Sequence, residues 1–337
     1  MAETSRIEWT DATFNPWIGC TKVSPACDNC YASVATPTRR FGIEWGAGKP
    51  RRRTAPSNWA LPLRWNAKHD EFFAEHGRRR RVFCASLADV FDTEVDPQWR
   101  IDLLELIAET PNLDWLLLTK RIGCAERLLD QALDVMSHGL TRWRDVPWPN
   151  VWIGATIANQ AEANRDIPKL LRVPAAVRFL SMEPLLGPVN LTQVMRTEHG
   201  DYRGDPENPD VWTYCDNVLS GFRAHKAGGV TDPRYAVDWV IVGGESGAGA
   251  RPMHPDWAYS LRDQCAEHGV PFLFKQWGEW KPAPGMIGET GEKLYSVGGV
   301  MHTSLQGGFS VARVGKKAAG RLLDGVEHTD FPGGPNA

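Results

Sequence analysis

Three cysteines, Cys20, Cys27 and Cys30, are clustered in the stretch FNPWIGCTKVSPACDNCY near the start of the chain. Their spacing is C-x6-C-x2-C, and no fourth cysteine or histidine follows at zinc-finger distance, since the next ones are Cys84 and His69. Three thiolates cannot complete a tetrahedral structural zinc site, but on a four-iron cluster they leave one iron open to a ligand. The pattern favours a [4Fe-4S] cluster; the alternative is a zinc ribbon completed by a remote residue.

The composition is that of a globular protein with a large core. The chain has 337 residues, of which 42% are hydrophobic and 23% charged, and its formal net charge is −3. No global field therefore draws it to nucleic acid or to a membrane, so any contact with a polyanion depends on a local patch. The seven cysteines are an odd number and are not spread as pairs, and the N-terminus is polar. These features predict a reducing, cytoplasmic location.

Short apolar runs alternate with longer helical segments along most of the chain. Continuous apolar strands alternating with helices indicate a parallel sheet that is buried on both faces. With a first strand before Cys20, we expect an α/β fold with a partial (β/α) barrel of about six to seven parallel strands. The predicted strands are 81–87, 114–119, 151–157, 177–182, 239–243 and 271–276, and the clearest predicted helices are 97–109, 160–171 and 257–268.

Polar residues follow every one of these strands. Ligands bind at the carboxyl ends of the strands in parallel α/β folds, so we interpret these residues as the lining of a ligand-binding mouth. Taken one strand at a time, an ordinary loop is the simpler reading. The strand ends carry Ser86, Lys120, Arg121, Thr156, Ser181, Glu183, Gly243, Gly244, Glu245 and Lys275.

The chain resembles the phage Gp37/Gp68 family, a radical-SAM-like group known by its three-cysteine motif. The similar segments cover Ile7 to about Gly325 and include IEWTDATFNPWIGC, CDNCYA, DWLLLTKR, NVWIGATIANQ, FLSMEPLLGPVNL, DWVIVGGESG, PFLFKQWG and GKKAAGRLLDG. The general radical SAM pattern is C-x3-C-x2-C, and this chain departs from it by having six residues in the first gap.

The resemblance implies a [4Fe-4S] cluster on Cys20, Cys27 and Cys30, with S-adenosylmethionine (SAM) bound to the open iron. An electron from the cluster would cleave SAM to a 5′-deoxyadenosyl radical that abstracts a substrate hydrogen. The resemblance further implies that Ser86 faces the methionine part of SAM, and that Thr156, Ser181 and Glu183 reach ribose or carboxylate groups. Gly243 and Gly244 join these as cofactor-binding candidates, and the catalytic candidates are Lys120, Arg121, Glu245 and Lys275.

Three functions stay open at this point. The first is a radical SAM enzyme that isomerises or rearranges a hypermodified thymine base in phage DNA, with DNA or a modified nucleotide as partner and a flavodoxin or ferredoxin as electron donor. The second is a radical SAM enzyme that acts on a small metabolite or peptide. The third is a non-catalytic, zinc-bearing nucleic-acid-binding protein. The first reading draws on the phage family, the Lys49–Arg53 and Arg78–Arg81 runs and the many tryptophans, although a solvated loop explains the triple arginine equally well.

The remaining segments are expected to be structural. Residues 1–280 form the barrel, with a polar insertion at 192–237, and residues 281–337 form a C-terminal appendage and tail with short antiparallel strands. Cys84 and Cys265 are expected in the core, Cys124 near the mouth, and Cys215 in the insertion.

Overall fold

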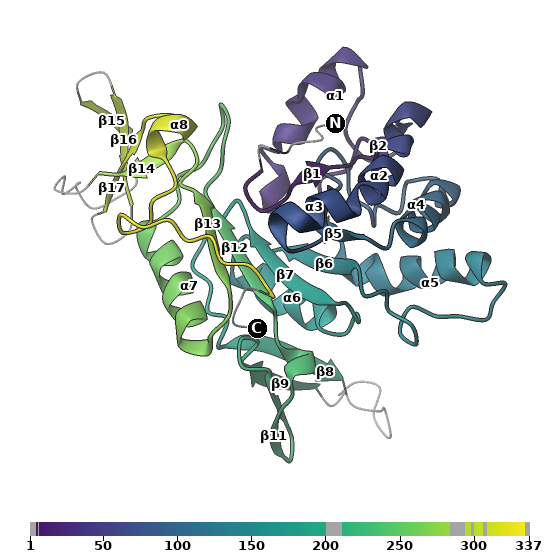
Figure 1. The fold of residues 1–337 in the computed structure, drawn as a ribbon. Helices are drawn as coiled ribbons and strands as arrows, with labels where there is room; N and C mark the ends of the chain where they lie inside the picture. Colours follow the sequence, from purple (N-terminus) through teal and green to yellow (C-terminus); the bar gives the residue numbers. More distant parts are fainter. Residues whose placement is uncertain are drawn as a thin grey trace. The chain divides into compact units, whose positions relative to one another are not determined.

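The computed structural model describes residues 5, 7–199, 211–283, 294–297, 300–305 and 309–333 (Figure 1). The chain divides into two compact units, which are described separately below. The first unit consists of Met1–Thr156 and Val173–Ser181, and the second of Ile157–Arg172 and Met182–Ala337.

Seven strands form one sheet in the order β1-β4-β5-β6-β7-β12-β13. The hydrogen-bonded pairs within each unit are parallel. The fold is therefore α/β with a parallel sheet, as expected, and its strand order is consistent with a partial (β/α) barrel. The strands are β1 (Ala12–Thr13), β4 (Arg80–Cys84), β5 (Leu113–Thr119), β6 (Val151–Thr156), β7 (Val177–Met182), β12 (Trp239–Gly243) and β13 (Phe272–Gln276).

The apolar runs produce these strands because both faces of the sheet are covered. All six residues of β6 and all five of β12 are buried. On β6, Gly154 lies beside Phe179 of β7, and a Cβ there would come within 2.3 Å of the Phe179 ring. Glycine at this position lets an aromatic ring fill the space that a side chain would take.

Helices of the first unit cover its strands. α2 contacts α3, α4 and β5, and α4 also packs on α5 (Figure 1). α4 begins at an N-cap, because the Asp96 carboxylate accepts a hydrogen bond from the Gln98 N–H over 2.9 Å and Pro97 occupies the first helical position. The α-helices are α1 (Thr36–Arg40), α2 (Pro56–Ala67), α3 (His69–His76), α4 (Pro97–Glu109) and α5 (Ala125–Met136).

Short elements complete the first unit. β2 and β3 form an antiparallel pair; η1, η2 and α1 lie between them in the chain, and η3 follows β5. The short elements are β2 (Trp17–Ile18), β3 (Arg52–Arg53), η1 (Pro25–Cys27), η2 (Tyr31–Val34) and η3 (Ile122–Cys124). The sequence from Cys27 to Ala35 predicts the start of a helix, but the structure has only the end of η1 and the separate 3-10 turn η2 there.

In the second unit, α7 (Pro255–His268) packs on β12 and β13, and α6 (Gln160–Leu170) contacts the insertion strand β8. α6 begins at the N-cap Asn159, whose side chain accepts from the Glu162 N–H, while the Glu162 carboxylate accepts from the N–H of Ala158, the residue before the cap. α7 ends at Gly269, whose φ of 67° is the left-handed conformation common at helix ends.

The insertion predicted at 192–237 consists of antiparallel strands. β8 (Val194–His199) pairs with β9 (Val211–Asp216), and β10 (Phe222–His225) pairs with β11 (Gly228–Thr231), followed by η4 (Pro233–Tyr235). Exposed residues alternate with half-buried ones along most of β9, as expected of a sheet with one solvated face.

The expected short antiparallel strands after residue 280 form a four-stranded sheet in the order β14-β17-β16-β15. Its elements are β14 (Trp280–Pro282), β15 (Leu294–Val297), β16 (Val300–Ser304) and β17 (Ser310–Arg313), with α8 (Lys316–Ala319) after them. The segment expected to be a tail lies along β13 instead: the Phe274 N–H donates to the His328 carbonyl, and the Asp330 N–H to the Phe272 carbonyl (Figure 1, yellow).

Candidate functional site

The three clustered cysteines lie on the loop after β2, in the first unit. Cys20 and Cys30 are half-buried, Cys27 is buried, and all three are free thiols. The turn η1 orders this loop. The Ser24 side chain caps η1 by accepting from the Ala26 N–H, and the Ser24 carbonyl accepts from the Cys27 N–H. The Cys30 N–H in turn donates to the Cys27 carbonyl, so these two cysteines lie on successive turns.

Arg121, which follows β5, contacts the first of these cysteines. Its Nη1 donates to the Cys20 Sγ over 3.2 Å, and its Nη2 donates to the Thr21 carbonyl over 2.6 Å. The pKa of the Cys20 thiol is raised to about 11, because burial and the nearby Asp89 carboxylate together outweigh the opposing effect of the Arg121 guanidinium. The end of β5 and the cysteine loop are thus joined by a buried guanidinium.

Asp89 positions that guanidinium. Its Oδ2 lies 3.2 Å from the Arg121 Nη1 and accepts from the Lys120 N–H over 3.0 Å, and its Oδ1 accepts from the Thr119 hydroxyl over 2.7 Å. Both side chains of the ion pair are less than a tenth exposed. Sequence reasoning did not select Asp89, although it follows the second expected strand, where a carboxylate can meet cations from the next strand end.

Ser86 is tied to the segment before the cysteines. Its Oγ accepts from the Asn15 Nδ2 over 2.9 Å, and the neighbouring Leu87 N–H donates to the Asn15 Oδ1 over 2.6 Å. The Tyr31 hydroxyl donates to the Ser86 carbonyl over 3.0 Å. The expected grouping of Ser86, Arg121 and the cysteine loop at the carboxyl ends of β1, β4 and β5 is therefore present within this unit.

Thr156 and Ser181 are the last paired residues of β6 and β7, directly opposite each other. Both are buried, with 4% and 3% of their surface exposed. The Thr156 Oγ1 has no hydrogen-bond partner in the described part of the chain. A buried hydroxyl without a partner costs free energy, so this one fits a ligand that supplies a hydrogen bond.

A second polar group lies in the second unit, at the ends of β12 and β13. The Lys275 ammonium binds both carboxylate oxygens of Glu183, at 2.9 and 2.8 Å. The Gln276 Nε2 donates to the Glu183 Oε1 and to the Ser246 Oγ, at 3.0 and 3.2 Å. The Gln276 Oε1 is buried without a partner among the described residues, so the group has an acceptor left over. Gln276 was not a candidate from sequence, although it ends the last predicted strand.

The neighbouring glycines and Glu245 belong to this second group. A Cβ on Gly243 would lie 3.2 Å from the Glu183 carboxyl carbon. A Cβ on Gly244 would lie 2.0 Å from the Trp277 carbonyl oxygen. Glu245 is occupied by Arg251, whose backbone N–H, Nε and Nη2 all donate to its carboxylate. Glu245 therefore forms an ion pair within the loop that joins it to Arg251, six residues further on.

The donor set of the cysteine loop suits an iron–sulfur cluster in kind, since it offers three free thiols on one loop. Across the described residues, no three or more His, Cys, Asp or Glu side chains are grouped closely enough to hold a metal ion. The thiols are therefore present without being arranged as a preformed metal site, and Cys20 is engaged with Arg121.

Most arginines of the runs that were expected to contact phosphate form ion pairs within the protein. Arg51 was expected on an exposed loop, but its side chain is 1% exposed and its Nε donates to the equally buried Asp92 over 2.8 Å. This part of the prediction was wrong, because the partner lies on a distant segment. Arg53 pairs with Asp102, and Arg78 and Arg79 pair with Asp11 and Asp114.

Three of the four other cysteines, Cys84, Cys265 and Cys215, lie where expected. Cys84 and Cys265 are fully buried, and burial raises the pKa of both thiols, for Cys265 to about 12. Cys124 is half-buried just before α5, and Cys215 is exposed on β9 of the insertion.

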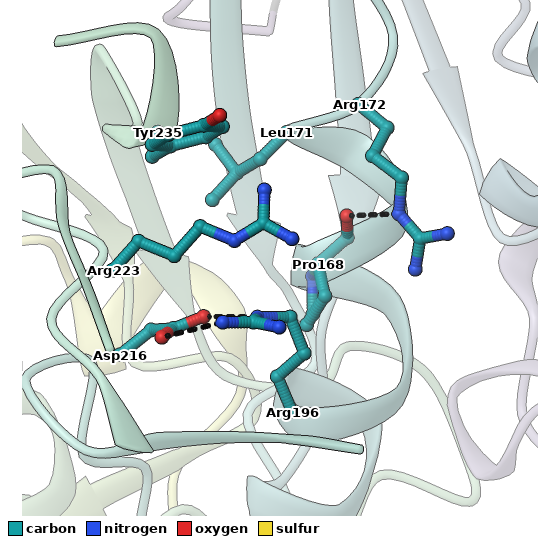
Figure 2. A pocket seen from close by; sticks show the side chains of 7 residues that line it. All are labelled: Pro168, Leu171, Arg172, Arg196, Asp216, Arg223 and Tyr235. Atoms are coloured by element: carbon teal, nitrogen blue, oxygen red, sulfur yellow. Dashed lines mark hydrogen bonds and ion pairs between the residues drawn. The ribbon is translucent and has the colours of Figure 1, made fainter. Parts of the chain in front are cut away.

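Three arginines line a small hollow between α6 and the insertion strands (Figure 2). Arg196 binds Asp216 through its Nε over 2.7 Å and also contacts Glu198, and Arg223 donates to Glu198 over 3.0 Å. Arg172 donates through its Nε to the Pro168 carbonyl over 3.2 Å. Because two carboxylates neutralise two of the guanidinium groups, we interpret this network as structural support for the insertion.

Fold and site together define an α/β protein with a parallel sheet, polar strand ends and a cysteine-rich loop. Residues 4–332 match the family described as protein of unknown function (DUF5131), and the chain belongs to that family. No curated protein and no solved structure matches the chain. In the described part of the chain, no helix is long and apolar enough to cross a membrane.

Proposed function

We propose that this protein is a radical SAM enzyme, with Cys20, Cys27 and Cys30 as the ligands of a [4Fe-4S] cluster. The observation that carries the proposal is the loop itself: three free thiols on one loop of the first unit, held against the buried Arg121–Asp89 ion pair at the end of β5. When bound, the cluster would supply the electron that cleaves SAM to a radical.

The chain's own residues would hold and shield the reactants. Arg121 fixes the cysteine loop against the end of β5 through its bonds to Cys20 and Thr21. Thr156 offers a buried hydroxyl in need of a partner, which suits a hydroxyl group of a ribose. The apolar strands behind these residues exclude water, which protects a radical from side reactions.

The test is anaerobic purification followed by reconstitution with iron and sulfide. We expect a brown protein with about four irons per chain for such a cluster. With SAM and a chemical reductant, 5′-deoxyadenosine should form. A colourless protein with one tightly bound zinc would contradict the proposal and support the zinc-bearing nucleic-acid-binding alternative.

For the substrate we retain the hypothesis of a modified thymine base in DNA, with a small metabolite or peptide as the alternative. A base inside a duplex is out of reach of a buried site, so this hypothesis requires a flipped base or a single strand. It also requires a surface outside the site that holds the strand.

A further inference from the structure

The segment from Cys20 to Arg53 carries a strong local charge asymmetry. It contains seven cations, Lys22, Arg39, Arg40, Lys49, Arg51, Arg52 and Arg53, against two carboxylates, Asp28 and Glu44, in a chain whose net charge is −3. Three of the cations are paired: Lys49 with Glu44, Arg51 with Asp92 and Arg53 with Asp102. Four cations and the carboxylate of Asp28 remain on this segment, which leaves an excess of three positive charges.

These four are Lys22, Arg39, Arg40 and Arg52, and all are exposed. The structure pairs none of them with a carboxylate among the residues that it describes. The Lys22 ammonium donates to the backbone carbonyl of Asp28 over 2.9 Å. The segment therefore presents net positive charge on the cysteine loop and on α1 next to it.

Two aromatic rings are exposed among these cations. Tyr31 is 55% exposed and Phe41 is 44% exposed. The Arg52 guanidinium lies 4.3 Å from the centre of the Phe41 ring, so a flat cation and a ring form one stack. We call the set Lys22, Tyr31, Arg39, Arg40, Phe41 and Arg52 the arginine–aromatic surface.

The backbone under this surface is held in place. The Thr38 hydroxyl donates to the Ala32 carbonyl over 2.7 Å, which ties α1 to η2. The Gly46 N–H donates to the Cys20 carbonyl over 3.1 Å, which returns the loop to the first cysteine. The cations and rings are thus displayed on an ordered loop, which lowers the entropy cost of binding.

We propose that the arginine–aromatic surface binds single-stranded nucleic acid. Arginine and lysine neutralise phosphates, and exposed rings and guanidinium planes stack on unpaired bases. An acidic protein would use the cations but would have little need of the two exposed rings, and in a duplex the bases are already stacked on one another. The inference concerns binding alone and does not depend on the iron site.

The experiment measures fluorescence anisotropy of a labelled 20-nucleotide single-stranded DNA with the full-length protein over a range of salt concentrations. Each phosphate contact with a single strand contributes a slope of about −0.7, so four contacts give about −3 in log K against log salt. The variant with Arg39→Gln, Arg40→Gln and Arg52→Gln should lose roughly tenfold in affinity or more at low salt, and its slope should flatten by about 2.

A matched control removes the same charge elsewhere. Arg127→Gln, Arg144→Gln and Arg234→Gln change three arginines outside the surface and should leave both affinity and slope close to wild type. Tyr31→Leu should weaken binding without changing the slope, because a ring contributes stacking and no charge.

Four outcomes would overturn the proposal: no salt-dependent binding at low ionic strength, equal loss in the two triple variants, tighter binding of a duplex of the same sequence, or equal binding of poly-glutamate. Iron content is measured on the same samples. A protein that binds the strand but never holds iron would contradict the proposed function and leave this inference standing.

Discussion

The Arg121 guanidinium lies between a thiol and a carboxylate: its Nη1 is 3.2 Å from the Cys20 Sγ and 3.2 Å from the Asp89 Oδ2. One side chain from the end of β5 thereby connects the cysteine loop to the segment after β4. The contact pairs residues that are far apart in sequence, so it depends on the parallel strand order. Removal of the Arg121 side chain should therefore lower the stability of the fold and the order of the cysteine loop.

We expect Arg121→Gln to lower the free energy of unfolding by about 3–5 kcal/mol, because it leaves the Asp89 carboxylate buried without its counter-charge. The double variant with Asp89→Asn should recover part of the loss. Urea denaturation of the two single variants and the double variant measures this coupling. The exposed pair Arg144–Glu126 is the control, and Arg144→Gln should cost less than about 1 kcal/mol. Equal costs for the two arginines would refute the structural role of Arg121.

Replacing Cys20, Cys27 or Cys30 singly by serine should abolish iron retention after reconstitution, because two thiolates with no fourth protein ligand cannot hold a four-iron cluster firmly. Cys215→Ser is the control, since Cys215 is exposed on β9 of the insertion. Iron and sulfide analysis with circular dichroism separates loss of the cluster from loss of the fold. Full iron content in all three variants would show that these cysteines are not the ligands of the cluster.

Much of the sheet was predictable because its strands are buried on both faces and read as unbroken apolar runs. β7 and β12 lie at their predicted bounds, and α4 does as well. The 3-10 turns of the cysteine loop were not foreseen, because Pro25 and Ser24 favour a short capped turn that resembles a helix start.

Site residues were predictable as to their place at strand ends but not as to their partners. Arg51 was expected in solvent, yet it is buried against Asp92, and nothing local in the sequence distinguishes it from the exposed Arg52 next to it. Asp89 and Gln276 were missed for the same reason: their importance comes from side chains that arrive from other strands. Local pattern predicts elements, whereas ion pairs are decided by tertiary contacts.

Asp11 predicts a pH dependence of stability in the first unit. Burial raises the pKa of its carboxyl, but bonds from the Arg78 guanidinium and the Arg81 N–H outweigh burial and hold the pKa below its ordinary value. A carboxyl with a lowered pKa stabilises the fold fully above about pH 4 and loses that contribution as the pH falls through the folded-state value.

Asp11→Asn should therefore reduce Tm at neutral pH, and the gap to wild type should narrow as the pH falls from about 5 to 3. Thermal melts at several pH values measure it. Glu75→Gln, at a side chain that is 75% exposed, is the control and should follow wild type throughout. A gap for Asp11→Asn that stays constant down to pH 3 would show that the carboxylate charge is not what stabilises the fold.

Gly244 and Gly243 test how closely the chain packs at the end of β12. The register shifts between Val242 and Gly243, and the Gly244 N–H donates to the Gln276 carbonyl, which brings Gly244 against the backbone of Trp277. A Cβ on Gly244 would lie 2.0 Å from the Trp277 oxygen, and backbone cannot yield as a side chain does. We expect Gly244→Ala to cost about 3 kcal/mol or more, by overpacking.

Gly243→Ala differs because the three atoms nearest to its Cβ would all belong to the Glu183 side chain, at 3.2–3.3 Å. The carboxyl group can shift by a few tenths of an ångström, so the cost in stability should be about 1 kcal/mol. Urea denaturation of both variants compares a backbone obstacle with a side-chain obstacle one residue apart. If Gly243→Ala proved as costly as Gly244→Ala, the Glu183–Lys275 pair would be far more rigid than its partly exposed side chains suggest, and it would have to be counted as structural support and not as an adaptable ligand site.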